Sequence, residues 1–371
     1  MKKEVIIIGA GPAGLGVASV LQRMGVHDFI IQEQNEIGAS FKKWPKEMRF
    51  ISPSFTGNNF KMPDLNAITP DTSPAYSLQT EHPTGVEYAA YLEAIAEIYE
   101  LPVETNQTVI EIQKSEGEWT IHTKTDTFIA KYVIWAAGEF HYPKTQDITG
   151  SEHCIHNSQV ESWSKLEGDK YVVIGGYESG IDAAIHLSRS GKMVAVLDNE
   201  EPWNETHSDS SYSVSPYTRD RLTEEIRNGR IALEGNTSVS AIRKEDDSYI
   251  VEYGDKTVIV EQKPILANGF ATSLQLVKEH FSFAADGYPE LTEDDESTLA
   301  INLFLVGPQV KHDEALFCFI YKYRQRFAVV AETIANRLDI AQEKVQEVIE
   351  DYTLYNFYLR DLSCCSTSCV C

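Results

Sequence analysis

The chain has 371 residues, of which 42% are hydrophobic and 24% are charged, and its formal net charge is -24 with a sequence pI near 4.8. This composition is that of a globular protein long enough for two domains. The negative charge repels phosphate backbones and anionic lipid, so we expect neither nucleic acid nor a membrane surface as a partner.

The N-terminal residues could pass for a secretion signal, because two lysines precede an apolar run. Glu4 and the turn residues from Gly9 to Gly14 interrupt that run, and no other stretch approaches the ~18 apolar residues of a membrane helix. The sequence therefore predicts a cytoplasmic protein. In that compartment thiols stay reduced unless they take part in redox or metal chemistry.

The first forty residues predict a dinucleotide-binding unit. A buried strand over Val5–Ile8 leads into a glycine turn, a helix from about Ala13 to Met24, and a second strand that ends at Glu33. The helix N-terminus would offer amide donors and a positive dipole to a pyrophosphate, and Glu33 would accept hydrogen bonds from a ribose. A strand, glycines, a helix, a strand and an acid in this order indicate much more than the glycines alone.

Three glycines in this turn fit the pattern GxGxxG, and each has a separate physical role. Gly9 permits the tight turn, Gly11 lets the backbone approach a pyrophosphate, and Gly14 lets the helix pack closely on the strand. The first unit is therefore predicted to bind a dinucleotide.

A second unit of the same kind follows downstream. Strands over Tyr171–Ile174 and Met193–Leu197 flank a glycine turn and a helix, and Asp198 ends the second strand. Tyr177 takes the middle position of GxGxxG, where a side chain would crowd a pyrophosphate. Asp198 favours a free ribose 2′-hydroxyl over a 2′-phosphate, so the sequence favours NADH over NADPH if this unit binds a nicotinamide.

From about Glu4 to Arg337 the chain resembles the flavoproteins with two dinucleotide-binding domains, and most closely their flavin-containing monooxygenase-like branch. The similar motifs come in the family's order: "GAGPAG" with Glu33, "IGASFKKWP", "TVIEI", "VIWAAG", "PILANGF" and "LFLVGP". The resemblance implies an α/β fold with two Rossmann-like domains, in which an inserted NAD(P)H-type domain splits the FAD domain. The expected boundaries are 1–162 plus 263–345 for the FAD domain, 166–262 for the insert, and 346–371 for a C-terminal extension.

The same resemblance implies two sets of cofactor-binding residues. The set for FAD is Gly9, Gly11, Pro12, Ala13, Gly14, Glu33, Gln34, Ser40, Phe41, Trp44, Val109, Ala137, Gly138 and Gly307. The set for NADH or NADPH is Gly175, Gly176, Tyr177, Glu178, Ser179, Gly180 and Asp198.

Two departures bear on the chemistry. Disulfide reductases of this superfamily place a pair of cysteines against the flavin, whereas Cys154 and Cys318 have no partner nearby in sequence. The monooxygenase signature FxGxxxHS is also degraded, because Gly150 and His156 are spaced too widely. We interpret His156 as a hydrogen-bonded loop residue, and the acidic segment 291–297 as a solvated loop.

Three functions follow as hypotheses. In the first, NADH or NADPH reduces FAD, O2 adds at the flavin C4a atom, and the flavin hydroperoxide oxygenates a soft nucleophile on a small-molecule substrate. Asn58 lies where the monooxygenase branch often keeps an asparagine near C4a, so it is the catalytic candidate, and a structural turn is the alternative. The second is an NAD(P)H-dependent reductase that passes electrons to a disulfide or a metal through C-terminal thiols. The third is a flavin-bearing redox or metal sensor.

The cysteine tail "SCCSTSCVC" carries Cys364, Cys365, Cys369 and Cys371. Thiolates select soft or borderline ions, and four of them could satisfy one tetrahedral ion. The tail is therefore predicted to bind one soft metal ion or to exchange with the disulfide of a thiol partner. An inert tail is the alternative.

Overall fold

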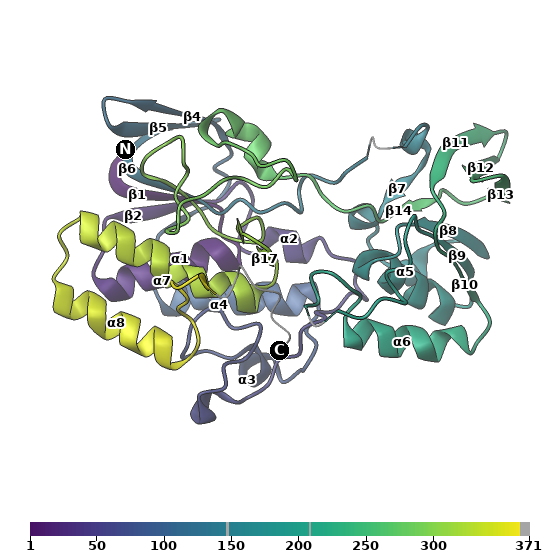
Figure 1. The fold of residues 1–371 in the computed structure, drawn as a ribbon, viewed down its shortest axis with the longest axis horizontal. Coiled ribbons are helices and arrows are strands. Elements are labelled where there is room, and N and C mark those ends of the chain that lie inside the picture. Colours follow the sequence, from purple (N-terminus) through teal and green to yellow (C-terminus); the bar gives the residue numbers. More distant parts are fainter. Residues whose placement is uncertain (146–147, 208, 364–371) are drawn as a thin grey trace. The chain divides into compact units, whose positions relative to one another are not determined.

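A computed structural model describes residues 1–145, 148–207 and 209–363 of the chain (Figure 1). The chain divides into two compact units. Unit 1 contains Met1–Lys42, Ser52–Glu139 and the chain from Thr272 onwards, and unit 2 contains Lys43–Ile51 and Phe140–Ala271. Among the described residues, no helix has both the length and the apolar character needed to cross a membrane.

Unit 1 is built on a seven-stranded sheet. Its strands are β1 (Lys2–Ile8), β2 (Phe29–Gln32), β3 (Val103–Glu104), β4 (Val109–Ser115), β5 (Glu118–Thr123), β6 (Thr127–Trp135) and β15 (Leu303–Leu305). The order is β3-β2-β1-β6-β5-β4, with β15 paired to β6. β1, β2, β3, β6 and β15 pair in parallel, and β4 and β5 are antiparallel. Ile8 lies opposite Gln32 and Trp135, so the carboxyl ends of β1, β2 and β6 form one edge.

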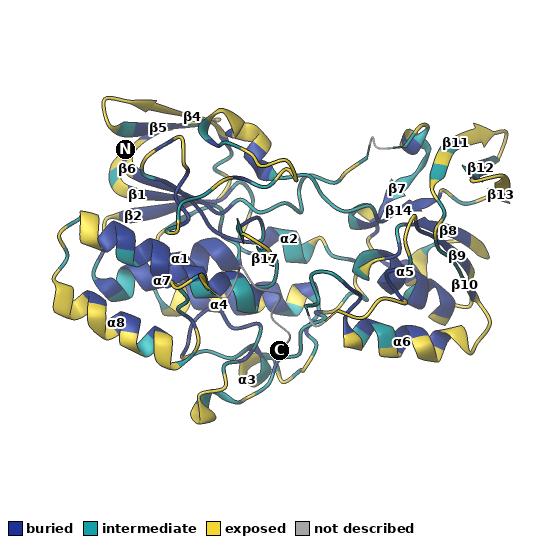
Figure 2. Ribbon diagram, in the orientation of Figure 1, coloured by how far each residue is buried: buried dark blue, intermediate teal, exposed yellow. Residues whose placement is uncertain are grey.

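Helices α1 (Pro12–Met24) and α7 (Ile320–Arg337) pack directly on each other in unit 1. A Cβ atom on Gly16 would lie 2.1 Å from the ring of Phe327, so only glycine admits this approach. Figure 2 shows both helices largely buried. The other helices of unit 1 are α2 (Ala39–Lys42), α3 (Pro74–Leu78), α4 (Gly85–Ile98) and α8 (Gln342–Leu354), with the short turns η1 (Asn58–Phe60), η5 (Ser273–Leu276) and η6 (Lys278–His280) and the hairpin β16 (Lys311–His312) and β17 (Ala315–Leu316).

Unit 2 repeats the parallel architecture on a smaller scale. Its five-stranded parallel sheet has the order β10-β9-β8-β14-β7, formed by β7 (Ile155–His156), β8 (Lys170–Ile174), β9 (Met193–Leu197), β10 (Ile231–Glu234) and β14 (Ile265–Leu266). A three-stranded antiparallel sheet follows, β11 (Val239–Glu245), β12 (Ser248–Tyr253) and β13 (Lys256–Val260). The helices are α5 (Glu178–Arg189) and α6 (Pro216–Ile226), with the turns η2 (Ser151–His153), η3 (Asn157–Gln159) and η4 (Trp163–Lys165). The mixed, mainly parallel sheet of unit 1 and the parallel sheet of unit 2 together confirm the predicted α/β fold class.

The compact units differ from the expected domain boundaries at segment 43–51, at residues 140–162 and 263–271, and at the C-terminus. Residues 140–162 and 263–271 were expected in the FAD domain, but β7 and β14 pair with each other and β14 pairs with β8, which places them in the sheet of unit 2. At the C-terminus, α8 packs on α7 and α1, so residues 346–354 belong to unit 1 and are not a separate extension.

Segment 43–51 belongs to unit 2, although unit 1 precedes and follows it in sequence. The carboxylate of Glu47 accepts hydrogen bonds from Ser162 Oγ at 2.6 Å and from the backbone N–H of Trp163 at 3.0 Å. The backbone N–H of Lys46 donates to Glu161 O at 3.0 Å. These bonds join the segment to the start of η4.

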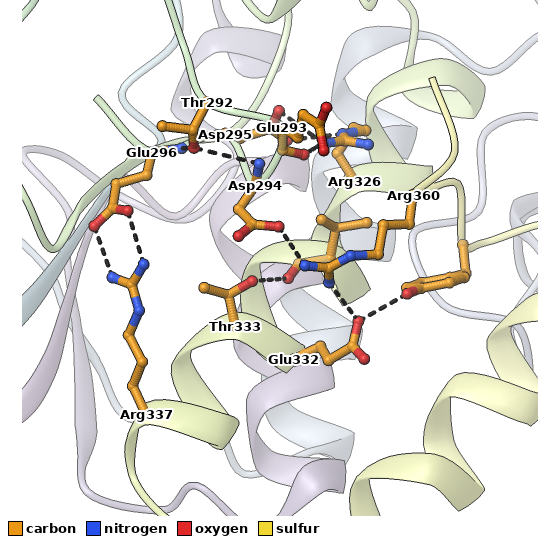
Figure 3. Close-up of polar contacts among 12 residues, drawn as sticks. Thr292, Glu293, Asp294, Asp295, Glu296, Arg326, Glu332, Thr333, Arg337 and Arg360 are labelled. Atoms are coloured by element: carbon orange, nitrogen blue, oxygen red, sulfur yellow. Dashed lines mark hydrogen bonds and ion pairs between the residues drawn. The ribbon is translucent and has the colours of Figure 1, made fainter. Parts of the chain in front are cut away.

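The acidic segment 291–297 is solvated only in its first half, where Glu293 is exposed, whereas its last three residues are buried, contrary to the interpretation from sequence. Asp295 has no exposed surface and Glu296 is 7% exposed. Arg326 on α7 donates to both carboxylate oxygens of Asp295, at 2.9 and 3.0 Å, and Arg337 donates to both oxygens of Glu296, at 2.7 and 2.8 Å (Figure 3). Asp295 and Glu296 therefore form a buried anchor for α7, because arginines distant in sequence neutralise their charges.

The chain after α8 contacts α7 and the acidic segment 291–297. Phe357 is fully buried beneath the guanidinium of Arg324, which lies 4.1 Å from the ring centre. Arg360 donates to Glu332 at 2.8 Å and to Asp294 at 2.5 Å, as Figure 3 shows. Phe357, an aromatic residue that precedes the cysteine tail, is therefore docked on unit 1.

Candidate cofactor sites

The first glycine turn lies at the carboxyl edge of the unit 1 sheet, between β1 and α1. Gly9 has a φ of 108°, and a Cβ atom there would lie 2.6 Å from Ala136 O. A Cβ atom on Gly14 would lie 1.9 Å from Gly9 O. Gly11 differs, because a Cβ atom there would meet nothing within 4 Å. The turn thus closes tightly behind Gly9 and Gly14 and leaves open space in front of Gly11, where the predicted pyrophosphate would sit.

Glu33 follows β2 at the same edge and is 7% exposed. Its Oε2 atom accepts from the backbone N–H of Ala10 at 2.8 Å, and Oε1 accepts from the N–H of Asn35 at 2.9 Å. These two bonds fix the carboxylate at the edge where a ribose diol of a bound dinucleotide would lie.

Segments distant in sequence meet at this edge. Gly38 N donates to Ala10 O at 3.2 Å, which brings the start of α2 and its residues Ser40 and Phe41 toward the turn. Gln107 N, two residues before Val109, donates to the backbone Glu33 O at 2.8 Å. A Cβ atom on Gly307 would touch Ala13 Cβ at 3.4 Å, so the closing strand ends at the start of α1. The residues present fit the pyrophosphate and ribose of FAD.

Two of the predicted FAD residues have other contacts. Phe41 packs edge-on against Tyr88, with ring centres 4.9 Å apart. Trp44 lies in segment 43–51 of unit 2, where it packs on Phe50 at 5.1 Å. A flavin contact of Trp44 therefore stays a prediction.

Asn58 holds the loop in which it lies. Its Nδ2 atom donates to Pro70 O at 3.0 Å and to Thr72 O at 2.9 Å, and its Oδ1 atom accepts from Asp64 N at 3.4 Å. Both ends of the amide are engaged by the backbone of the loop. This geometry favours the structural alternative over the predicted role near the flavin.

The glycine turn of unit 2 repeats that of unit 1. Gly175 has a φ of 107°, and a Cβ atom on Gly180 would lie 1.9 Å from Gly175 O. Asp198 Oδ2 accepts from Gly176 N at 2.5 Å, and its Oδ1 accepts from Glu200 N at 2.8 Å. These are the same contacts that Glu33 makes in unit 1. The structure therefore assembles two dinucleotide-type turns, each with its acid in place.

The middle residue is where the two turns differ. Tyr177 has φ -81° and ψ -168°, close to the -85° and -172° of Gly11. Its side chain therefore leaves the backbone in the direction that is open in front of Gly11. The side chain is 39% exposed, and its hydroxyl interacts with Glu200. Burial, followed by the charges of Glu200 and Glu205, raises the pKa of the phenol.

Glu178 was predicted to bind the nicotinamide cofactor, but its carboxylate has another role. It accepts hydrogen bonds from Thr218 Oγ1 at 2.6 Å and from Ser215 N, at the beginning of α6. Burial raises the pKa of Glu178, whereas these bonds oppose the shift. The side chain joins α5 to α6, which leaves only the backbone of Glu178 for a ligand.

Asn268 is a candidate that the sequence did not reveal. It follows β14, and neither Nδ2 nor Oδ1 of its side chain has a hydrogen-bond partner, although both atoms are buried. An unsatisfied buried polar group costs about 1–3 kcal/mol. The neighbouring Gly269 O is already bound by His156 Nε2 at 3.0 Å and Lys144 N at 3.1 Å. The interpretation of His156 as a hydrogen-bonded residue is confirmed, but it ends strand β7 and does not lie in a loop.

The described cysteines do not form a dithiol. Cys154 lies in unit 2, where burial raises the pKa of its thiol to about 12. Cys318 lies in unit 1, just before α7. Cys364, Cys365, Cys369 and Cys371 lie outside the described residues. Within the described part of the chain, no group of three or more His, Cys, Asp or Glu residues could hold a metal ion.

Comparison with known proteins agrees with this geometry. The bacilliredoxin reductase Bdr of Bacillus subtilis is 24% identical over 348 residues, which cover 91% of this chain and 99% of that protein. An uncharacterized oxidoreductase, CzcO of Bacillus velezensis, is 28% identical over 205 residues, and the match spans about half of each protein, 53% of this chain and 55% of the relative.

Among solved structures, the bacillithiol disulfide reductase Bdr of Staphylococcus aureus has a TM-score of 0.75 at 22% identity, with 91% of this chain and 99% of that chain covered. The ornithine N-hydroxylase of Kutzneria sp. 744 has a TM-score of 0.72 at 14% identity, with 91% and 100% covered. The sequence pattern of the pyridine nucleotide-disulphide oxidoreductases matches residues 6–307. The chain therefore belongs to the pyridine nucleotide-disulphide oxidoreductase family and is an FAD-dependent oxidoreductase.

Proposed function

We propose that the protein is an NAD(P)H-dependent flavoprotein reductase that transfers electrons to a disulfide. The observation that carries this proposal is the extent of the match to a bacilliredoxin reductase, which covers 91% of this chain and 99% of the relative. The probable indole-3-pyruvate monooxygenases of Arabidopsis thaliana match over only 44% to 46% of their length.

The proposed reaction uses two nucleotide sites, one for FAD in unit 1 and one for NAD(P)H in unit 2. In unit 1 the turn at Gly11 and the carboxylate of Glu33 hold the pyrophosphate and ribose of FAD, and the tight packing at Gly9 fixes the turn. In unit 2 Asp198 is the corresponding acid for NAD(P)H. FAD, when bound, accepts a hydride and gives up two electrons. The overall reaction is balanced when NAD(P)H and one proton convert one S–S bond into two thiols and release NAD(P)+.

The C-terminal thiols are the proposed relay to the substrate. Arg360, whose guanidinium pairs with Glu332 and Asp294, fixes the chain to unit 1 four residues before Cys364. The eleven residues that follow Arg360 have a contour length of at most ~36–40 Å, which sets the greatest reach of the proposed relay. Binding of one soft metal ion is the alternative use of the same four thiolates.

Oxygenation is the second candidate. It is favoured by the distribution of the described cysteines, because Cys154 and Cys318 lie in different units and cannot serve as a dithiol within one of them. If the tail takes no part, the described residues offer no pair of thiols to accept electrons.

Anaerobic titration of the purified full chain distinguishes these functions. We expect NADH or NADPH to bleach the flavin absorbance, and a disulfide such as glutathione disulfide or oxidised bacilliredoxin to restore it with two thiols formed per NAD(P)H. A variant with all four tail cysteines changed to serine keeps the length of the tail and should lose this reoxidation. A Cys318→Ser variant tests the remaining thiol of unit 1.

Other results of these experiments would support oxygenation, contradict both functions or assign the tail to a metal. Reoxidation only by O2, with one oxygen atom incorporated into an amine or thioether, would establish oxygenation. No bleaching with either nucleotide would contradict both functions. Binding of one zinc ion per chain that is lost in the four-serine variant would assign the tail to a metal.

A further inference from the structure

Besides its glycine turn, each unit has a second strand that ends beside that turn with the same backbone contacts. These strands are β6 in unit 1 and β14 in unit 2. In unit 1 Ala136 N donates to Ile8 O at 2.9 Å, and in unit 2 Ala267 N donates to Ile174 O at 2.7 Å. A Cβ atom on Gly9 would lie 2.6 Å from Ala136 O, and one on Gly175 would lie 2.4 Å from Ala267 O. The residues that follow, Ala137 in unit 1 and Asn268 in unit 2, therefore occupy equivalent positions beside their turns.

The amide of Asn268 is the unusual feature of this position. Among the described residues it is the only side chain with two buried polar atoms that both lack a partner. The nearest backbone groups cannot supply one, because Ala267 N is bound to Ile174 O and Gly269 O already accepts two hydrogen bonds. A buried amide that the fold leaves unsatisfied calls for a partner from outside the chain.

Tyr177 explains why unit 2 needs a donor here and unit 1 does not. In unit 1 the open space before Gly11 lets a pyrophosphate reach the backbone of the turn. In unit 2 the side chain of Tyr177 extends from the equivalent backbone position. A phosphate must then lie farther from the turn, and the end of β14 is adjacent to it.

We infer that Asn268 is a nucleotide-binding residue of unit 2, whose Nδ2 donates to an oxygen of the bound pyrophosphate and replaces the backbone approach that Tyr177 prevents. The inference rests on the proposed function, in which unit 2 binds NAD(P)H. The ligand class is a nucleoside diphosphate, because the amide lies beside a turn whose acid, Asp198, is placed for a ribose. The Oδ1 atom is free to accept from a hydroxyl of the same ligand.

The test compares Asn268→Ala, which copies the Ala137 of unit 1, with the wild-type FAD-loaded full chain. Calorimetric titration with NADH, NADPH and ADP-ribose should show a dissociation constant that rises about 10- to 100-fold for the nucleotide that the wild type prefers, the loss expected for one hydrogen bond to a charged group. The FAD content should not change, and the unfolding midpoint should stay the same or rise, because an unsatisfied amide has been removed.

Asn157→Ala is the matched control. Asn157 also lies in unit 2, and its Oδ1 atom is buried without a partner, but it belongs to η3 and not to the strand end beside the turn. Its substitution should leave the dissociation constant unchanged. Asn268→Asp keeps the shape and adds a negative charge, so it should bind the nucleotide more weakly than Asn268→Ala.

Two results would overturn the inference. An unchanged dissociation constant in Asn268→Ala, with nucleotide bound by the wild type, contradicts the role of Asn268 and leaves the proposed function intact. A wild type that binds none of the three nucleotides contradicts both. Nucleotide binding that weakens in Asn268→Ala while no nucleotide bleaches the flavin supports the inference and contradicts the proposed function alone.

A double variant tests whether Tyr177 and Asn268 act on the same phosphate. If Tyr177 displaces the phosphate toward Asn268, then Tyr177→Gly should restore tight binding to Asn268→Ala, and the two changes should not be additive. Additive effects would show that the two residues act on different parts of the ligand, which contradicts the replacement of the turn by the amide.

Discussion

Arg326 and Asp295 form an ion pair in which neither side chain has any exposed surface, joined by two hydrogen bonds of 2.9 and 3.0 Å. The same guanidinium donates to Leu359 O, so the pair also holds the chain that leads to the cysteine tail. Removal of Arg326 takes the guanidinium away from the buried carboxylate of Asp295 and leaves that carboxylate with His312 Nε2, at 2.5 Å. The loss of a buried pair costs far more than the loss of an exposed pair.

Arg326→Met should therefore lower the free energy of unfolding by about 3–5 kcal/mol. Arg360→Met is the control, because its pairs with Asp294 and Glu332 are partly exposed and should contribute about 1 kcal/mol or less. Thermal and urea unfolding of both variants measure the difference. Equal losses in the two variants would contradict the burial of the Arg326 pair.

Substitutions at Tyr177 and Gly11, the middle residues of the two glycine turns, test whether a side chain at this position excludes a nucleotide. Tyr177→Gly should tighten nicotinamide nucleotide binding by the ~1–3 kcal/mol typical of a relieved steric conflict. Gly11→Tyr should abolish FAD binding without unfolding unit 1, because a Cβ atom there meets nothing within 4 Å. Flavin absorbance and circular dichroism report the two results. A yellow Gly11→Tyr protein would show that the turn tolerates a side chain in front of a pyrophosphate.

Glu47 should make stability depend on pH in the acid range. Burial acts to raise its pKa, but hydrogen bonds from Ser162, Ser164 and Trp163 outweigh this and lower it to about 2. A carboxyl group with a lowered pKa stabilises the folded state fully above its unfolded pKa near 4.3, and that contribution is lost as the pH falls toward 2. The midpoint difference between wild type and Glu47→Gln should thus be largest above pH 5 and shrink toward pH 2. A constant difference would contradict this.

Asp198 should set the preference for NADH. Its carboxylate, 7% exposed and fixed by Gly176 N and Glu200 N, repels a 2′-phosphate on the ribose. Asp198→Asn keeps the shape and removes the charge, so the affinity for NADPH relative to NADH should rise about 5-fold or more. Binding titrations of both nucleotides measure the ratio, and an unchanged ratio would place the ribose elsewhere.

Asn58→Ala separates the structural and catalytic roles of that residue. The three hydrogen bonds of Asn58 connect the backbone at Pro70, Thr72 and Asp64. Its loss should expose the loop to proteolysis near Lys61, while the FAD content and the rate of flavin reoxidation stay within about 2-fold of wild type, as for a substitution outside the reacting centre. A reoxidation rate that falls by a factor of ten or more, with an intact loop, would restore the catalytic role.

The sequence predicted both glycine turns and their acids because these depend on neighbours within about thirty residues. It could not predict Asn268 as a candidate, because the position of β14 beside β8 depends on a strand pairing across about ninety residues of intervening chain, and no local pattern shows that an amide lacks a partner. Tyr177 was recognised as an exception to the pattern, and the structure adds that its backbone still has the angles of Gly11.

The burial of acids in segment 291–297 was not predicted from the sequence. Four acids in the five residues 292–296 look solvated when only their own neighbourhood is considered. Their arginine partners on α7 lie 31 and 41 residues further along the chain, so the neutralisation is visible only in the folded protein. Burial of charge is decided by tertiary contacts, which composition does not record.

Segment 43–51 has a consequence for recombination between related flavoproteins. The backbone passes from one unit to the other at Lys42–Lys43, Ile51–Ser52, Glu139–Phe140 and Ala271–Thr272. A graft of residues 140–271 alone would carry Trp163 into a new host without the carboxylate of Glu47 that accepts its N–H. A functional chimera must therefore inherit both residues 43–51 and residues 140–271. A crossover only at the borders of 140–271 would separate two stretches of the gene that encode a single compact unit.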